Sequence, residues 1–323
     1  MTTPLLDIHL TDSDADTALR ADARAGLTTV PKVLPPKWFY DARGSALFER
    51  ITELPEYYPT RTERTLLERS ADAIAAASGA DTLVELGSGS SEKTRLLLDA
   101  FRRAGTLRRY VPQDVSEAAL RQAMAALAAE YADVELHGVV GDFTAHLDRL
   151  PAEGHRMVAF LGGTIGNLPP SERAGFLRAL RAALRPGERF LLGTGLVVDP
   201  AVLVPAYDDA AGVTAEFNRN VLHVLNRELR ADFDVDAFAH RAVWDAEREW
   251  IEMRLVAQRD MTVSVAGLDL TVGFAAGEEM CTEVSAKFRL PRVRAMLAEA
   301  GFAVVDGWTD PDERMALTLA VAS

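Results

Sequence analysis

A glutamate and two glycines, spaced Glu85-x-Gly87-x-Gly89, form the stretch best suited to hold a small ligand. Thr82–Glu85 suits a short buried strand, and apolar residues within Glu92–Phe101 recur at helical spacing. Glycine has no Cβ, so a glycine turn between strand and helix lets the backbone approach a ligand closely. The stretch therefore predicts a ligand beyond the carboxyl end of a strand in a doubly wound sheet.

The turn differs from the two common phosphate-binding loops. The dinucleotide fingerprint requires glycine or alanine three residues after its second glycine, and Glu92 occupies that position. A Walker A loop requires glycine before its Lys-Thr pair, and Lys93-Thr94 follows Glu92 instead. Because a bulky anion lies where two phosphates would need room, a dehydrogenase is disfavoured and we expect a cofactor without phosphates.

Acidic residues follow the next two predicted strands. Asp114 comes directly after Arg109–Gln113, where doubly wound folds hold ribose hydroxyls, although it could instead cap the next helix. Asp142 and Phe143 follow the strand Val134–Val140. Here a carboxylate could accept from an adenine amino group while the aromatic ring covers the base. The two positions together predict a binding site for an adenosine group.

A glycine-rich loop with a polar tip follows the fourth predicted strand, Met157–Leu161. Three glycines within Gly162–Pro170 would let the backbone meet a ligand. Amine methyltransferases often place a polar side chain in this loop, so Asn167 is the candidate for holding an acceptor nitrogen. The alternative is a turn-forming asparagine before Leu-Pro-Pro.

The regular alternation of strands and helices stops between Gly195 and about Lys287 and then resumes. About 90 residues is far too long for a plain loop, so this segment predicts a second lobe inserted into the sheet domain. Within it, Pro200–Arg227 is largely helical, Met261–Phe274 alternates like antiparallel strands, and Gly277–Ser285 is expected to be a loop. After the insertion we expect a helix and then a closing pair of strands.

Aromatic residues are concentrated near the N-terminus, within Lys37–Ser45 and Leu54–Arg61. They could pack the core of a small lobe or form an aromatic wall for a cationic or amine substrate. The second group leads into a helix expected over Thr60–Ser70, with Glu63 as its capping-box partner. Tyr57 would project from this junction.

Composition restricts the possible functions. The chain has 323 residues and a formal charge of −13, which argues against a nucleic-acid substrate and an anionic membrane surface. Cys281 is the single cysteine, so disulfides within the chain and cysteine-based metal clusters are excluded. The N-terminus lacks the pattern of a secretory signal, and no long apolar run occurs. We expect a soluble cytoplasmic protein.

Several stretches together resemble the histidine-specific Nα-methyltransferases of ergothioneine biosynthesis. These enzymes are class I S-adenosylmethionine-dependent methyltransferases. The stretch Glu85-x-Gly87-x-Gly89 is similar to the first sequence motif of that class. The resembling stretches cover nearly the whole chain: Pro35–Asp41, Leu54–Glu63, Glu85–Gly89, Phe160–Asn167, Ala206–Thr214, Phe217–Asn220 and Gly277–Ser285.

The resemblance implies a fold and a reaction. It implies a Rossmann-like α/β sheet domain, residues 61–194 and 287–323, and a substrate-binding α+β lobe, residues 1–60 and 195–286. The enzyme would transfer three methyl groups from S-adenosylmethionine, which leaves as S-adenosylhomocysteine, to the α-amine of L-histidine, giving hercynine. The implied cofactor positions are Gly87, Lys93, Asp114, Asp142 and Phe143. The implied substrate positions are Tyr57, Asn167, Tyr207, Met253, Glu283, Val284 and Ser285, of which Asn167, Tyr57 and Tyr207 are the catalytic candidates.

The chemistry of these residues suits the reaction. Displacement at a sulfonium needs no metal, and Glu283 can accept from an imidazole N–H while Ser285 matches the other ring nitrogen. The amine must lose a proton before each transfer, yet every histidine lies outside these motifs, so we expect water or a tyrosine to relay the proton. The six histidines are His9, His137, His146, His155, His223 and His240.

Two other functions remain to be distinguished. A methyltransferase for tryptophan or tyrosine would be better served by an apolar residue in place of Glu283. A non-catalytic nucleotide-binding protein would retain the fold without the substrate residues. We expect L-histidine as the only partner, with no nucleic acid and no membrane, and a monomer.

Overall fold

The computed structural model describes residues 4–323 and divides the chain into two compact units. We call them the sheet unit, residues 4–11, 62–196 and 288–323, and the lobe unit, residues 12–61 and 197–287. Each has its own buried apolar core.

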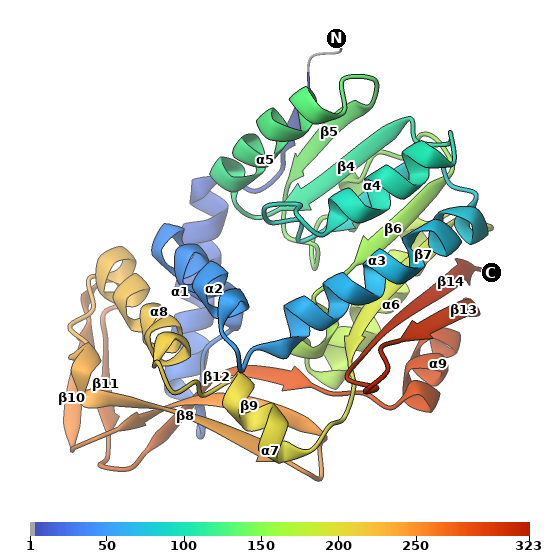
Figure 1. Ribbon diagram of the computed structural model, residues 1–323. Helices are drawn as coiled ribbons and strands as arrows, with labels where there is room; N and C mark the ends of the chain where they lie inside the picture. Colours follow the sequence, from blue (N-terminus) through green and yellow to red (C-terminus); the bar gives the residue numbers. More distant parts are fainter. Residues whose placement is uncertain (1–3) are drawn as a thin grey trace. The chain divides into compact units, whose positions relative to one another are not determined.

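An eight-stranded sheet with the order β1-β5-β4-β3-β6-β7-β14-β13 organises the sheet unit (Figure 1). The strands from β1 to β7 are parallel to their neighbours, whereas β14 is antiparallel to both β7 and β13. The predicted doubly wound sheet and its closing strand pair are therefore confirmed. The strands are β1 (Leu5–Ile8), β3 (Thr82–Leu86), β4 (Arg109–Asp114), β5 (Glu135–Val140), β6 (Arg156–Phe160), β7 (Arg189–Gly195), β13 (Phe302–Thr309) and β14 (Met315–Ala322).

Helices pack on this sheet through periodic apolar faces. In α4, Leu97 and Phe101 are fully buried and join one core cluster with Leu120 and Leu127 of α5 and Leu67 of α3. The spacing of these apolar residues gives each helix a single face to bury. The helices of the unit are α3 (Tyr58–Ser78, in this unit from Thr62 onward), α4 (Thr94–Arg103), α5 (Glu117–Glu130), α6 (Pro170–Ala183) and α9 (Leu290–Glu299).

The N-terminal strand corrects the expected extent of the lobe. Residues 1–60 were expected to lie in the lobe, but β1 pairs in parallel with β5, with Leu5 opposite His137 and Ile8 opposite Val140. Residues 4–11 consequently belong to the sheet unit. The part of the prediction that concerns residues 1–3 lies outside the described residues. The four-residue strand has too little pattern of its own to reveal a partner so distant in sequence.

Three helices and a four-stranded sheet form most of the lobe unit (Figure 1). Helix α8 buries Phe217, Val221 and Leu225, which share a core cluster with Phe39 and Leu255. The sheet order is β2-β12-β9-β8, and a separate hairpin pairs β10 with β11. The elements are α1 (Asp12–Thr28), β2 (Lys32–Val33), α2 (Ala42–Glu53), α7 (Pro200–Leu203), α8 (Val213–Leu229), β8 (Phe238–Asp245), β9 (Trp250–Ala257), β10 (Met261–Val265), β11 (Leu270–Phe274) and β12 (Glu279–Ala286).

Strand β12 corrects another prediction. Gly277–Ser285 was expected to be a loop, but from Glu279 onward it lies in this strand, which is antiparallel to β9 on one side and parallel to β2 on the other. The acidic residues at its start resemble loop residues in the sequence, yet Glu279 forms ion pairs with Arg254 of the neighbouring strand β9 and with Arg241 of β8. Tertiary pairing thus determines the strand.

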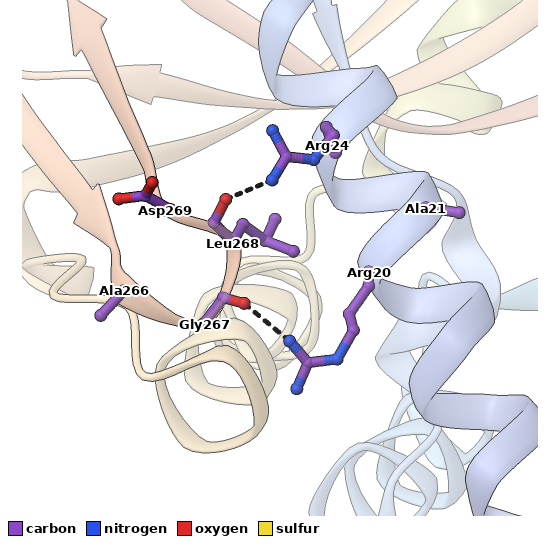
Figure 2. A pocket seen from close by; sticks show the side chains of 7 residues that line it. All are labelled: Arg20, Ala21, Arg24, Ala266, Gly267, Leu268 and Asp269. Carbon is purple, nitrogen blue, oxygen red and sulfur yellow. Dashed lines mark hydrogen bonds between the residues drawn. The ribbon is translucent and has the colours of Figure 1, made fainter.

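The helical prediction for the lobe unit is confirmed over α8. Helix α1 is held to another part of this unit by two arginines. Figure 2 shows Arg20 and Arg24 donating to the carbonyls of Gly267 and Leu268, the former over 2.7 Å, beside an open surface hollow of about 470 Å³. Both guanidinium groups are engaged by main-chain acceptors. Between residues 4 and 323, no helix has the length and apolar character needed to cross a membrane.

Candidate functional site

The glycine turn after β3 is tied to the acid at the end of β4. Gly87 and Gly89 adopt φ values of +68° and +50°, and a Cβ added to either would meet no other atom within 4 Å. Asp114 accepts from the Gly89 N–H over 2.9 Å and from the Ser116 N–H over 3.0 Å. The cap of α5 is Ser116 rather than Asp114. The open main chain and the half-buried carboxylate form a cradle suited to a hydroxyl-bearing ligand.

Asp142 and Phe143 lie beside Asp114, as the predicted order of strands requires. The Gly141 N–H donates to the Asp114 carbonyl over 2.9 Å, which joins the ends of β4 and β5. One Asp142 oxygen accepts from both donors of Thr144. The Phe143 ring contacts Phe160, with ring centroids 5.0 Å apart. The structure therefore brings these predicted cofactor residues to one edge of the sheet.

The capping-box prediction for Glu63 is wrong. Helix α3 already begins at Tyr58, and the fully buried Glu63 carboxylate accepts from the Gly162 N–H over 2.7 and 2.9 Å. It also forms an ion pair with Lys93. Glu63 thus connects the loop after β6 to the predicted cofactor lysine. Sequence reasoning missed this role because Thr-x-x-Glu is locally indistinguishable from a capping box.

Glu85 is a buried support of the turn. Its carboxylate accepts from the hydroxyls of Thr94 and Tyr110, which hold the start of α4 and the strand β4. Burial raises the pKa of Glu85 to about 7, although hydrogen bonds from both hydroxyls oppose the shift. Its negative charge therefore does not lie at the open mouth of the site.

Two further polar side chains near the turn were not predicted. Gln113 is fully buried at the end of β4, and neither of its amide atoms has a hydrogen-bond partner within residues 4–323. The buried Ser88 hydroxyl likewise has no partner among these residues, although its main-chain N–H donates to the Gln113 carbonyl. Because such groups normally have partners, these atoms are candidates to bind a ligand or water.

Asn167 ends the short 3₁₀ helix Thr164–Asn167, as the loop prediction requires. Gly163 before it adopts a left-handed conformation, with φ +68°. The Asn167 side chain is half-buried, and no hydrogen bond within the described part of the chain engages its amide. The amide can therefore donate to or accept from a ligand.

In the lobe unit, the predicted substrate residues gather at the end of β12. The Tyr207 hydroxyl lies 3.1 Å from Ser285 Oγ, and the rings of Tyr57 and Tyr207 meet edge to face with centroids 6.2 Å apart. Lys287, which was not predicted, donates from Nζ to Tyr207 Oη over 2.7 Å and to Ser285 Oγ over 2.8 Å. All four side chains are buried.

Strand geometry also explains the positions of Glu283 and Met253. Glu283 pairs with Met253 across β12 and β9, and both side chains are buried. Residues two apart on a strand share a face, so Glu283 and Ser285 lie on one face and the Val284 side chain on the other. The site thus combines a carboxylate, a hydroxyl and an apolar thioether, leaving Val284 only a main-chain role.

Burial sets the protonation of the two tyrosines. It raises the pKa of Tyr57 well above its ordinary value and also raises the pKa of Tyr207, an effect that the Glu283 charge reinforces for both. The phenolate form is therefore disfavoured. We expect both hydroxyls to act as neutral hydrogen-bonding groups.

A hydrogen-bonded chain behind the site holds the main chain of Tyr207. The Thr282 hydroxyl donates to Asn218 over 2.6 Å, and the Asn218 amide donates to His240 Nδ1 over 2.8 Å. His240 Nε2 therefore carries the proton and donates to the Tyr207 carbonyl over 2.8 Å. Burial lowers the pKa of His240, which keeps the ring neutral for this role.

Within residues 4–323, no group of three or more histidine, cysteine, aspartate or glutamate side chains is placed to hold a metal ion. The residues around the glycine turn do fit an adenosine-containing cofactor. The main chain is open at Gly87, carboxylates lie at Asp114 and Asp142, and Gln113 has unpartnered amide atoms.

Comparisons with known proteins are specific. A family model described as "Histidine-specific methyltransferase, SAM-dependent" matches residues 19–322. The chain is 60% identical to the histidine N-alpha-methyltransferase of Mycolicibacterium smegmatis, covering 99% of this chain and 100% of that one. It is 56% identical to the enzyme of that name from Mycobacterium tuberculosis, covering 97% of each. A solved S-adenosylmethionine-dependent methyltransferase from Clostridium acetobutylicum shares the fold, with a TM-score of 0.50 at 10% identity, covering 85% of this chain and 97% of that one.

Proposed function

Because the chain belongs to the S-adenosylmethionine-dependent histidine-specific methyltransferases, we propose that it methylates the α-amine of L-histidine. Three successive transfers give hercynine, the trimethylated betaine used in ergothioneine biosynthesis. The observation that carries the substrate assignment is the buried pair Glu283 and Ser285 on one face of β12. A carboxylate and a hydroxyl at this spacing match the N–H and the bare nitrogen of one neutral imidazole ring.

S-adenosylmethionine supplies an activated methyl group on a sulfonium. We assign its ribose hydroxyls to Asp114, since this carboxylate is fixed by the Gly89 N–H and lies at the end of β4. Asp142 accepts from the adenine amino group, and Phe143 covers the ring. The open main chain of Gly87 and the ammonium group of Lys93 complete the set of residues proposed to bind the cofactor.

We assign the substrate's amine and carboxylate to hydrogen-bonding groups that can donate to or orient them. These are the Asn167 amide and the hydroxyls of Tyr57 and Tyr207. Met253 lines the pocket for the ring, and Val284 contributes only main-chain atoms. Alignment of the amine with the sulfonium accounts for most of the acceleration, up to roughly 7–11 kcal/mol for ideally held reactants.

Proton removal must accompany each transfer, because an ammonium group has no lone pair. The raised pKa values of Tyr57 and Tyr207 make a tyrosinate base unfavourable. Water, ordered by the tyrosine hydroxyls, is therefore our candidate for carrying protons away. Matching pH–rate profiles for the parent enzyme, Tyr57→Phe and Tyr207→Phe would agree with this assignment, whereas loss of an alkaline limb in either variant would indicate a tyrosine relay.

The main alternative substrate is another aromatic amino acid. The buried pair of Glu283 and Ser285 favours imidazole over indole, because an indole offers an N–H to the carboxylate but no bare nitrogen to the Ser285 hydroxyl. Competition between histidine and tryptophan for labelled cofactor tests the choice. Preferential labelling of histidine supports the proposal, and labelling of tryptophan alone would defeat it. A cytoplasmic monomer acting only on this small substrate completes the proposal.

A further inference from the structure

The roles proposed above make no use of the Lys287 ammonium group. Lys287 follows β12 and is 7% exposed, and its main-chain N–H donates to the Glu249 carbonyl over 2.8 Å. Its Nζ lies 2.7 Å from Tyr207 Oη and 2.8 Å from Ser285 Oγ, and these hydroxyls lie 3.1 Å from each other. The three polar atoms therefore form a closed triangle inside the lobe unit.

The chemistry of the three groups gives this triangle a direction. An ammonium group can only donate, so both hydroxyl oxygens must accept from Lys287. One hydroxyl can then donate to the other, and the second O–H has no acceptor left inside the triangle. It must point out of the triangle, where it can donate to an acceptor on a bound molecule. A neutral amine in the same place could accept a hydroxyl proton and would reverse this direction.

We infer that Lys287 is a positioning residue that fixes Tyr207 and Ser285 as hydrogen-bond donors, so that the site selects substrates presenting an acceptor there. Such an acceptor is a carboxylate or the bare nitrogen of a neutral imidazole. The inference rests on the proposed function, since it concerns how histidine is chosen. In a substrate with a donor at that position, the donor hydrogen would face the hydroxyl hydrogen of the site, and no hydrogen bond could form.

The competing role for Lys287 is that of a proton acceptor. Burial lowers the pKa of Lys287 to about 8, against the opposing effect of the Glu283 charge. However, a buried amine stores one proton, whereas complete methylation of one histidine releases three. Lys287 would have to discharge between transfers through hydroxyls to which it is itself the donor. The direction of these hydrogen bonds therefore supports an orienting role for Lys287.

Titration of Lys287 gives the orienting role a characteristic pH dependence. The groups that face its ammonium are Glu283 of β12 and the Tyr207 ring, whose centroid lies 4.9 Å from Nζ. The main-chain carbonyl of Glu249 accepts from the Lys287 N–H. Below about pH 8 the charged lysine holds both hydroxyls as donors. Above that pH the neutral amine can accept, and affinity for an acceptor-bearing ligand should fall.

The test uses imidazolepropionate, which retains the ring and carboxylate of histidine but has no amine to titrate. Its Kd is measured by calorimetry on the full chain with S-adenosylhomocysteine present, from pH 7.5 to 9.5. We expect Lys287→Met to weaken binding roughly 10- to 100-fold at pH 7.5, as for loss of a charged hydrogen-bond donor, and to lack the alkaline weakening of the parent. Lys287→Arg should recover part of the affinity without the alkaline limb.

Lys32→Met is the matched control, because Lys32 of β2 is also a buried lysine of the lobe unit but pairs with Glu278. It should leave the Kd unchanged. If Lys287→Met binds within twofold of the parent with the same pH profile, the inference is overturned. If the melting curve of Lys287→Met shows that this variant is misfolded, Lys287→Arg decides between the outcomes. Partial affinity that does not fall at alkaline pH supports the inference, and a pH dependence of the Kd like that of the parent overturns it. Absence of histidine methylation by the parent would instead refute the proposed function.

Discussion

Replacing Glu63 by glutamine tests the contacts that Glu63 makes with Lys93 and the Gly162 loop, which the sequence analysis did not predict. The substitution preserves the shape of a fully buried side chain on α3 but removes its charge. The glutamine carbonyl can still accept from the Gly162 N–H, which Glu63 binds over 2.7 and 2.9 Å. The principal loss is therefore the ion pair with Lys93.

The expected magnitude follows from the burial of the two partners. Breaking a fully buried ion pair costs about 3–5 kcal/mol. The Lys93 side chain is 24% exposed, against 1% for Glu63, so water can compensate for part of the lost attraction. We expect Glu63→Gln to lower the free energy of unfolding by about 2 kcal/mol. Cofactor affinity should fall about tenfold, because a lysine no longer held in place must be ordered on binding.

Urea denaturation and calorimetric titration with S-adenosylhomocysteine measure the two effects. Glu68→Gln on the same helix is the control, because Glu68 pairs with Arg64 at the surface over 3.4 Å. That pair should contribute less than about 1 kcal/mol and should not affect cofactor binding. If Glu63→Gln matched the parent in both measurements, the proposed coupling of α3, Lys93 and the Gly162 loop would be refuted.

Three further predictions concern the two parts of the candidate site. Glu283→Gln should lower kcat/KM for histidine by roughly 10- to 100-fold while leaving the Kd of S-adenosylhomocysteine unchanged, because a buried charged acceptor for the ring is lost; equal activity would contradict its role. Gly87→Ala places a side chain at φ +68° and should weaken cofactor binding and lower the free energy of unfolding by about 1 kcal/mol. Gly187→Ala, at φ +91° and also in open space, should lower the free energy of unfolding without affecting cofactor binding. The pKa of Glu85 is raised from 4.5 to about 7, so the folded state binds this proton more tightly; the stabilising contribution is full below pH 4.5 and is lost as pH rises to 7. The urea midpoint of the parent should therefore fall relative to that of Glu85→Gln as pH rises from 4.5 to 7, and parallel curves would refute the assignment.

Most of the sheet unit could be predicted from the sequence because its elements carry strong local patterns. The strand before the glycine turn is a continuous buried run, and α4 has a regular apolar face. The carboxyl ends of parallel strands lie at one edge of a doubly wound sheet, so the sequence alone could place Asp114 and Asp142 near each other. These inferences needed only local periodicity and topology.

The missed features depend on partners distant in sequence. Glu63 lies 99 residues from Gly162, and Lys287 lies 80 residues from Tyr207. Strand β12 begins with acidic residues whose loop-like character is overridden by ion pairs to β8 and β9. A local pattern cannot reveal such contacts, because the same residues satisfy a capping box or a surface loop equally well.

The central claim is that one chain adds three methyl groups to the α-amine of histidine. Mass spectrometry of histidine incubated with the protein and S-adenosylmethionine tests it most directly. We expect mass gains of one, two and finally three methyl groups, with fragments that place all three on the α-nitrogen. Histidine that keeps its original mass while another amino acid gains methyl groups, or methylation of the ring, would refute the proposed function.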